Sequence, residues 1–181
     1  DGLMDYAPGT TDLRPGLAES YEISDDLLTY TFKLRPGVKF HNGREMTADD
    51  VKYSFDRVLL PATQSPGAGF FGSIKGADKM ADGSATSLEG LTVVDPLTVR
   101  FELSRPDATF LHVLALNFAS VVPKEAVEAS GGDFGHQPVG TGAYKMGEWL
   151  PGQRVVFQKN PDYWRAGLPY LDQITFEIGQ E

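Results

Sequence analysis

The sequence of 181 residues contains no cysteine and only three histidines. The lack of cysteine excludes disulfides, thiolate nucleophiles and zinc–cysteine sites among these residues. The histidines, His41, His112 and His136, are scattered, and their spacing is typical neither of a metal site nor of a base that activates a nucleophile. The sequence also has no G-x-S-x-G, Walker or zinc-helix motif. We therefore expect no cofactor, no metal site and no familiar catalytic centre.

Concentrated positive charge is also lacking, and the formal net charge of -9 is spread along the chain. Such a surface repels phosphate backbones, so nucleic acid is not an expected partner. The apolar stretch at residues 110–122 is interrupted by His112, Asn117 and Ser120. It is shorter than the roughly 20 apolar residues that span a bilayer, so we expect no membrane insertion of these residues. His112 is expected to be a core or interface residue, whereas His41 is expected to be solvated in a turn.

Carboxylates are plentiful, and two adjacent pairs are candidates for acid–base catalysis, Asp25–Asp26 and Asp49–Asp50. Neighbours in a strand point to opposite faces, and neighbours at the start of a helix diverge by about 100°. Neither pair therefore converges on one substrate atom, as a general acid and base must. We infer that the protein is not an enzyme. A hydrolase that uses scattered carboxylates is the weaker, enzymatic alternative.

The most informative segment lies between residues 30 and 53. Residues 30–34 alternate apolar and polar side chains, which predicts a strand with one buried face. A turn, a short extended piece and an Asn-Gly turn follow. Thr47 is placed to cap a helix by accepting a hydrogen bond from the backbone of Asp50, and the acidic side chains here favour the positive end of the helix dipole. The helix is expected to stop at Pro61.

The rest of the pattern predicts mixed helices and strands, an α+β chain. Residues 61–87 are predicted to form a long loop with a helical turn near residues 74–80. Further elements are expected at these positions: a hairpin at 91–94 and 98–103, a helix from Pro106, a helix from Pro123 to Gly131-Gly132, and strands at 144–149, 154–159 and 173–178. We expect six aromatic residues of these elements in the core: Phe101, Phe110, Trp149, Phe157, Trp164 and Phe176.

Gly140-Thr141-Gly142 has the G-x-G spacing found in some phosphate-binding loops. It lacks the third glycine and the lysine, and the residues after it are predicted to form a strand, so no helix terminus faces an anion. Two glycines suit a crossing where backbones approach closely. We therefore predict that Gly140 and Gly142, like the capping residues Thr47 and Asp50, have a structural role.

Several segments together resemble one family of proteins. They are, in chain order, Leu17–Tyr21, Asp26–Phe32, the block at residues 30–53, Val94–Val99, Val122–Glu125, Pro138–Tyr144 and Asn160–Trp164. In this order they resemble family 5 of the bacterial extracellular solute-binding proteins, the oligopeptide and dipeptide receptors of ABC importers. The resemblance implies a protein that captures a small solute such as a peptide and delivers it to an ABC membrane permease. A ligand-sensing domain of a transcriptional regulator would share the pattern and is the second alternative.

The resemblance also implies an architecture, the type II periplasmic-binding-protein fold with an accessory domain inserted in its first lobe. Residues 1–12 would belong to the first lobe, residues 13–138 to the accessory domain, and residues 139–181 to the return strands of the first lobe. The second lobe would be absent, so this fragment is expected to expose apolar edges and to show self-association or unusually apolar crystal contacts. The implied location is periplasmic or extracellular, with a lipoprotein anchor as one option.

For the ligand site, the resemblance points to the loop that begins at Ser65-Pro66. In peptide-binding relatives this loop approaches the ligand and can present a tyrosine. Gly67 takes that place here, and Phe70 and Phe71 follow in a glycine-rich stretch. We nominate Phe70 and Phe71 as the substitutes that contact the ligand.

Overall fold

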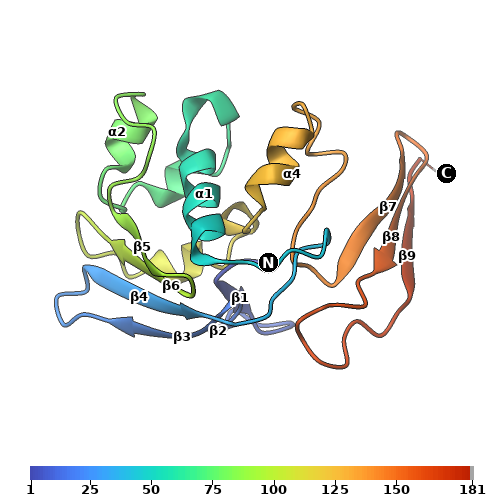
Figure 1. The fold of residues 1–181 in the computed structure, drawn as a ribbon, viewed down its shortest axis with the longest axis horizontal. Helices are drawn as coiled ribbons and strands as arrows, with labels where there is room; N and C mark the ends of the chain where they lie inside the picture. The colour runs from blue at the N-terminus through green and yellow to red at the C-terminus, as the bar shows by residue number, and fades with distance from the viewer. Residues whose placement is uncertain (180–181) are drawn as a thin grey trace. The chain divides into compact units, whose positions relative to one another are not determined.

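The computed structural model describes residues 1–179 and divides into two compact units (Figure 1). Unit 1 consists of Asp1–Pro36 and Thr47–Val121, and unit 2 consists of Gly37–Met46 and Val122–Glu181. Each unit is therefore built from segments that are separated in the sequence.

Unit 1 contains two antiparallel sheets. The small one pairs β1 (Met4–Tyr6) with β2 (Leu13–Pro15). The larger one has the order β3-β4-β6-β5, with β3 at Ala18–Ile23, β4 at Thr29–Leu34, β5 at Leu91–Asp95 and β6 at Thr98–Glu102. The predicted strand at residues 30–34 and the predicted hairpin of β5 and β6 are confirmed.

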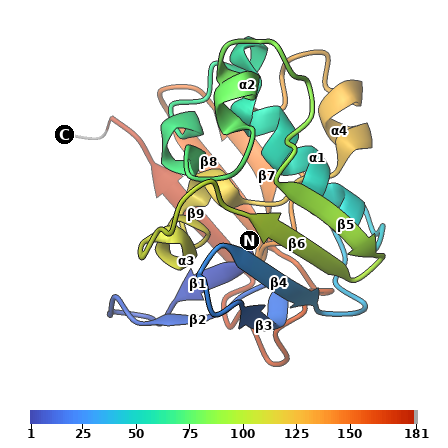
Figure 2. The same cartoon turned by 90° about the vertical axis from the view of Figure 1, so that its left-hand side faces the viewer.

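Helix α1 (Ala48–Leu59) packs against β5 and β6 of this sheet (Figure 2). It begins as the sequence predicts, because Thr47 and Asp50 form a capping box in which the Thr47 N–H donates to Asp50 Oδ2 over 2.8 Å. Beneath the helix, Phe101 lies at the centre of an aromatic cluster. Its ring centroid is 5.8 Å from that of Phe32, 5.1 Å from Phe55 and 5.4 Å from Phe110. The predicted core positions of Phe101 and Phe110 are therefore confirmed.

The segment after α1 is more regular than the predicted long loop. It contains three helical turns, η1 (Pro61–Thr63), η2 (Ala68–Phe71) and α2 (Ala77–Ala81). The helix predicted from Pro106 is shorter than expected, with α3 at Phe110–Val113 and η3 at Asn117–Ala119. The reason is local, since Asp107 Oδ1 accepts the Thr109 N–H over 2.9 Å and holds a turn where the helix was expected to begin.

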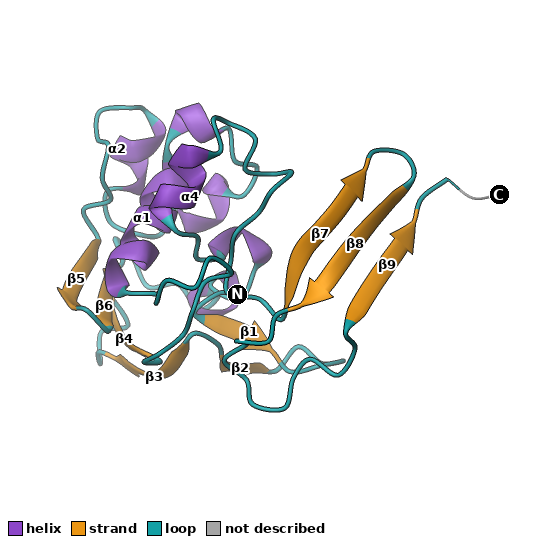
Figure 3. Ribbon diagram, turned by 45° about the vertical axis from the view of Figure 1, so that its right-hand side comes forward, coloured by secondary structure: helices purple, strands orange, loops and turns teal. Residues whose placement is uncertain are grey.

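Unit 2 joins helix α4 (Lys124–Ala129) to an antiparallel sheet in the order β7-β8-β9 (Figure 3). The strands are β7 (Tyr144–Leu150), β8 (Arg154–Lys159) and β9 (Gln173–Glu177), as predicted. The glycines after α4 have positive φ angles of 59° and 98°, which confirms the predicted end of this helix. The segment Gly37–Met46 of unit 2 is bound to α4 by Arg44, whose Nε donates to Glu125 Oε1 over 2.6 Å and whose Nη2 donates to Oε2 over 3.1 Å.

The predicted core positions of Trp149 and Phe176 are wrong, because their side chains are 39% and 55% exposed. Both lie opposite Val155 in the strand register, so they share one face of the β7-β8-β9 sheet. The sequence pattern assigned both to the core, but this face of the sheet is only partly covered. Phe157 and Trp164 are half-buried. No helix among residues 1–179 has the length and apolar character needed to cross a membrane.

Candidate functional site

The nominated ligand loop lies in unit 1, and its two phenylalanines have different environments. Phe71 is fully buried, and its ring meets that of Phe55 edge to face with the centroids 5.2 Å apart. Phe70 is 50% exposed and stacks on Phe118, which is 40% exposed. These two rings are 5.8 Å apart and inclined by 17°. We call Phe70 and Phe118 the exposed aromatic pair.

Gly67 makes this pair possible. A Cβ atom added to Gly67 would lie 2.2 Å from Phe118 Cγ, far inside van der Waals contact. The ring of Phe118 therefore occupies the space that any larger residue at position 67 would need. Sequence reasoning singled out Gly67 and Phe70 but missed Phe118, which belongs to η3, a distant part of the chain.

The exposed aromatic pair can contact apolar groups of a ligand through its flat, solvent-facing rings. The same loop also lines a cavity of about 410 Å³, together with the end of α1 and with α2. Small residues dominate its walls, among them Ala68, Gly69, Gly72, Ala77 and Ala81. Ligand contact by Gly67, Phe70 and Phe71 stays a prediction, and the geometry makes Phe70 the accessible member of the three.

In unit 2, His41 is joined by hydrogen bonds to the chain at Gly140 and Gly142. The His41 N–H donates to the Gly140 carbonyl over 2.8 Å, and His41 Nδ1 accepts the Gly140 N–H over 3.3 Å. Nε2 then donates to the Gly142 carbonyl over 2.9 Å. This arrangement, which we call the His41 clasp, needs a neutral imidazole protonated on Nε2.

The His41 clasp corrects the expectation of a solvated histidine, since His41 is half-buried. Burial lowers the pKa of His41 below its usual 6.5, and the positive charge of Lys145 acts in the same direction, against the raising effect of the bond to Gly142. The expectation for His112 also fails, because its side chain is exposed and meets Tyr6, with the ring centroids 5.9 Å apart.

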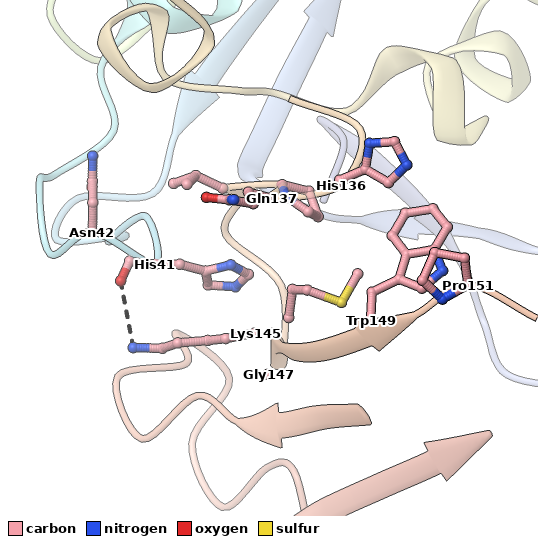
Figure 4. A pocket seen from close by; sticks show the side chains of 11 residues that line it. His41, Asn42, His136, Gln137, Lys145, Gly147, Trp149 and Pro151 are labelled. Atoms are coloured by element: carbon pink, nitrogen blue, oxygen red, sulfur yellow. Dashed lines mark hydrogen bonds between the residues drawn. The ribbon is translucent and has the colours of Figure 1, made fainter. Parts of the chain in front are cut away.

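A cavity of about 690 Å³ lies beside the clasp, entirely within unit 2 (Figure 4). We call it the Trp149 cavity. It is lined by His41, Asn42, His136, Gln137, Pro138, Val139, Lys145, Met146, Gly147, Trp149 and Pro151. Its volume is typical of a site for a small molecule. Sequence reasoning missed it, because its walls come from three segments that no local pattern connects.

Two features dominate the chemistry of the Trp149 cavity. The rings of Trp149 and His136 lie 4.5 Å apart, and Asp133 holds the Nδ1 side of His136. Lys145 Nζ donates to the His41 carbonyl over 3.5 Å, as Figure 4 shows. Among residues 1–179, no group of three or more histidine, aspartate and glutamate side chains is placed to hold a metal ion.

The chain matches the bacterial extracellular solute-binding proteins, family 5 Middle, over residues 12–181. It therefore belongs to this family. The mixed helices and strands of the structure agree with the predicted fold class, and solved relatives share the fold. The comparisons support the transport interpretation and give no support to the regulator or hydrolase alternatives.

Individual relatives bind peptides or peptide-like solutes, as their names state. Di/tripeptide-binding protein 4 of Pseudomonas aeruginosa (strain UCBPP-PA14) is 38% identical to this chain, over 97% of this chain and 34% of that protein. Glutathione-binding protein GsiB of Escherichia coli O1:K1 / APEC is 36% identical, over 91% of this chain and 29% of that protein. The substrate-binding domain of an oligopeptide ABC transporter from Bacillus anthracis str. Ames has a TM-score of 0.92 at 30% identity, covering 98% of this chain and 35% of that chain. The chain thus spans about a third of the length of these relatives.

Proposed function

We propose that the protein is the solute-binding component of an ABC importer, which captures a peptide or a related small solute and delivers it to a membrane permease. The observation that carries this proposal is the family match over residues 12–181, together with relatives that are named as peptide-binding proteins. The protein would act outside the cytoplasmic membrane, where a lipoprotein anchor would keep it near the permease.

Capture needs no chemical step. A ligand that contacts two lobes only when they are closed shifts an existing equilibrium between open and closed forms. In this proposal, residues 13–138 form the accessory domain, and residues 1–12 and 139–181 belong to the first lobe. The second lobe lies outside this chain and would supply the other half of the peptide site.

Within this chain, we assign the ligand contact to Phe70. Its side chain is exposed, it belongs to the loop that the family resemblance indicates, and Phe118 fixes its orientation by stacking. Phe71 would support the loop from inside, because it packs on Phe55. A flat aromatic surface of this kind suits an apolar side chain of a bound peptide.

The experiment uses the full-length protein. Mass spectrometry of what copurifies identifies the solute class, and calorimetry with dipeptides, tripeptides, longer peptides and glutathione measures affinity. We expect Phe70→Ala to weaken binding of the preferred peptide roughly 2- to 12-fold, the value of one aromatic contact. Phe176→Ala, which truncates an equally exposed phenylalanine on β9, is the matched control and should leave the affinity unchanged. Equal affinities for Phe70→Ala and the unmodified protein would overturn the assignment of Phe70, and failure of all peptides to bind would overturn the proposed function.

A further inference from the structure

The cavity of about 410 Å³ between the end of α1, the loop of Phe70 and α2 lies entirely within unit 1. We call it the α2 cavity. Its lining includes one aspartate, Asp78, and no lysine, arginine or histidine. The α2 cavity therefore carries a single ionic group, and that group is negative at neutral pH.

The spacing along α2 places Asp78 on the same side of the helix as the two alanines that line the cavity. Ala77 and Ala81 are four positions apart, and Asp78 precedes Ala81 by three, so the three side chains share one face. Met80 leaves the helix in another direction and is fully buried in the core. Ala77 is 3% exposed, whereas Asp78 is exposed. Ala77 thus lies at the floor of the cavity, and the Asp78 carboxylate lies at its rim.

The Asp78 carboxylate is available to a ligand. Its side chain forms no ion pair and no hydrogen bond with another residue in the described range, 1–179. The next residue, Lys79, does not compensate its charge, because Lys79 Nζ lies 3.0 Å from Glu89 Oε2 and donates to it. A ligand cation would give Asp78 the charged partner that the described residues do not provide.

The remaining lining selects for a compact apolar body. Leu59 is only 4% exposed, and three alanines and two glycines leave the space beside it empty. A Cβ atom added to Gly69 would meet no atom within 4 Å, and one added to Gly72 would meet only the Gly69 carbonyl oxygen, at 3.6 Å. A ligand can therefore lie close to the backbone of this loop. Apolar walls, one charged group and a volume in this range are the usual composition of a site for a small organic molecule.

We propose that the α2 cavity binds a small organic cation, with its apolar body against Leu59 and Ala77 and its ammonium group at the Asp78 carboxylate. Charge complementarity selects the cation, because no positive side chain of the lining competes for Asp78 and an anion would be repelled by it. Neither Phe70 nor Phe118 lines the cavity, so the site is separate from the contact assigned to Phe70. The proposal goes beyond peptide capture and does not depend on it.

The first test measures the charge preference by ligand-observed NMR titration of the full-length protein. The probe is cyclohexylmethylamine, and cyclohexanecarboxylate is the charge-reversed probe of similar size. We expect the amine to bind at least about threefold more tightly. Asp78→Asn should weaken binding of the amine about two- to fivefold, because an ion pair with an exposed carboxylate contributes this much. Asp49→Asn is the matched control, since Asp49 is the exposed second residue of α1 as Asp78 is of α2, and it should have no effect.

The second test fills the cavity. Ala81→Leu should weaken binding of the amine at least about fivefold, because the larger side chain occupies space that the apolar body needs. Ala81 is the exposed last residue of α2, and Ala129 is the exposed last residue of α4. Ala129→Leu is therefore the matched control and should leave the affinity unchanged. If Ala81→Leu does not fold, as judged by circular dichroism, the comparison of Asp78→Asn with Asp49→Asn decides the question.

Three results would overturn the proposal. They are equal affinity for amine and carboxylate, equal effects of the two asparagine variants, and equal effects of the two leucine variants. Displacement of the amine by the preferred peptide would also overturn it, since that would place the probe in the peptide site. Failure of peptides to bind tests the proposed function alone, because the amine titration requires no peptide.

Discussion

Replacement of Gly67 by alanine gives a sharp test of how the exposed aromatic pair is held. The new Cβ would lie 2.2 Å from Phe118 Cγ, 2.5 Å from its Cβ and 2.6 Å from its Cδ1, so the backbone must shift. Overpacking of this kind costs about 1–3 kcal/mol of unfolding free energy. Rotation of the Phe118 ring does not remove the clash with the Phe118 Cβ, so the backbone of the loop or of η3 must shift, which would also disturb the stacking on Phe70.

The sign of the effect should reverse once the whole Phe118 side chain, including its Cβ, is removed. Gly67 has φ -87° and ψ -9°, which alanine adopts without strain. In a Phe118→Gly background, which also removes the Phe118 Cβ, Gly67→Ala should therefore stabilise the protein by about 0.4–1 kcal/mol, since alanine restricts the unfolded chain. The double-mutant cycle then has a coupling energy of roughly 1.4–4 kcal/mol.

The assay is urea denaturation of the four proteins in the cycle, followed by circular dichroism, with a common slope used to convert midpoints into free energies. Gly69→Ala is the matched control in the same loop. No atom lies within 4 Å of its added Cβ, so this change should be neutral or slightly stabilising. Equal effects of Gly67→Ala in both backgrounds would refute the reasoning.

Two further predictions concern buried polar contacts. The first is that stability falls as the pH drops through 6.5, because the lowered pKa of His41 means that the unfolded chain binds the proton more tightly than the folded chain does. His41→Gln should show a smaller loss of stability between pH 7.5 and pH 5, measured by urea denaturation. The second is that Asp56→Ala destabilises the protein by about 1–3 kcal/mol, since it leaves the Leu88 N–H, now 2.7 Å from Asp56 Oδ1, without its acceptor and removes the ion-pair partner of the Lys52 ammonium, which keeps Ser87 Oγ and the Leu88 carbonyl.

Each of these two predictions has its own control. For the first, the slope of unfolding free energy against pH is compared between His41→Gln and the unmodified protein. Every other titrating group contributes equally to both slopes, so identical slopes would contradict the role of His41. Asp49→Ala changes an exposed carboxylate of the same helix and should cost less than about 1 kcal/mol. If Asp49→Ala and Asp56→Ala have equal effects, the buried contacts of Asp56 contribute no special stability.

Local sequence patterns were sufficient for most of the strands and for α1. The alternation in β4 and in β9 reports directly which side chains share a face, and the capping box at Thr47 marks the start of α1 within one residue. These signals depend on neighbours within a few positions. Of the three helical turns between α1 and β5, α2 matches the turn predicted near residues 74–80, whereas η1 and η2 were missed because they depend on tertiary contacts, such as the packing of Phe71 on Phe55.

The candidate sites were harder to predict for the same reason. Gly67 could be singled out because, by the family resemblance, it stands where relatives can present a tyrosine, but its partner Phe118 could not, because only the folded chain brings them together. The exposure of Trp149 also escaped prediction, since periodicity says which residues share a face and does not say whether another element covers it. His41 and Gly142 meet although they are 101 positions apart.

The separation of 101 positions between His41 and Gly142 has a consequence for the order in which the two units fold. A ribosome releases residues 37–46 long before Gly140 and Gly142 exist, and loop closure over such a distance is a slow, entropically unfavourable step. The hydrogen bond from His41 to Gly142 therefore cannot form until about a hundred later residues have been synthesised. The intervening unit 1 segment, residues 47–121, can fold during this interval, so unit 2 is expected to be completed after unit 1.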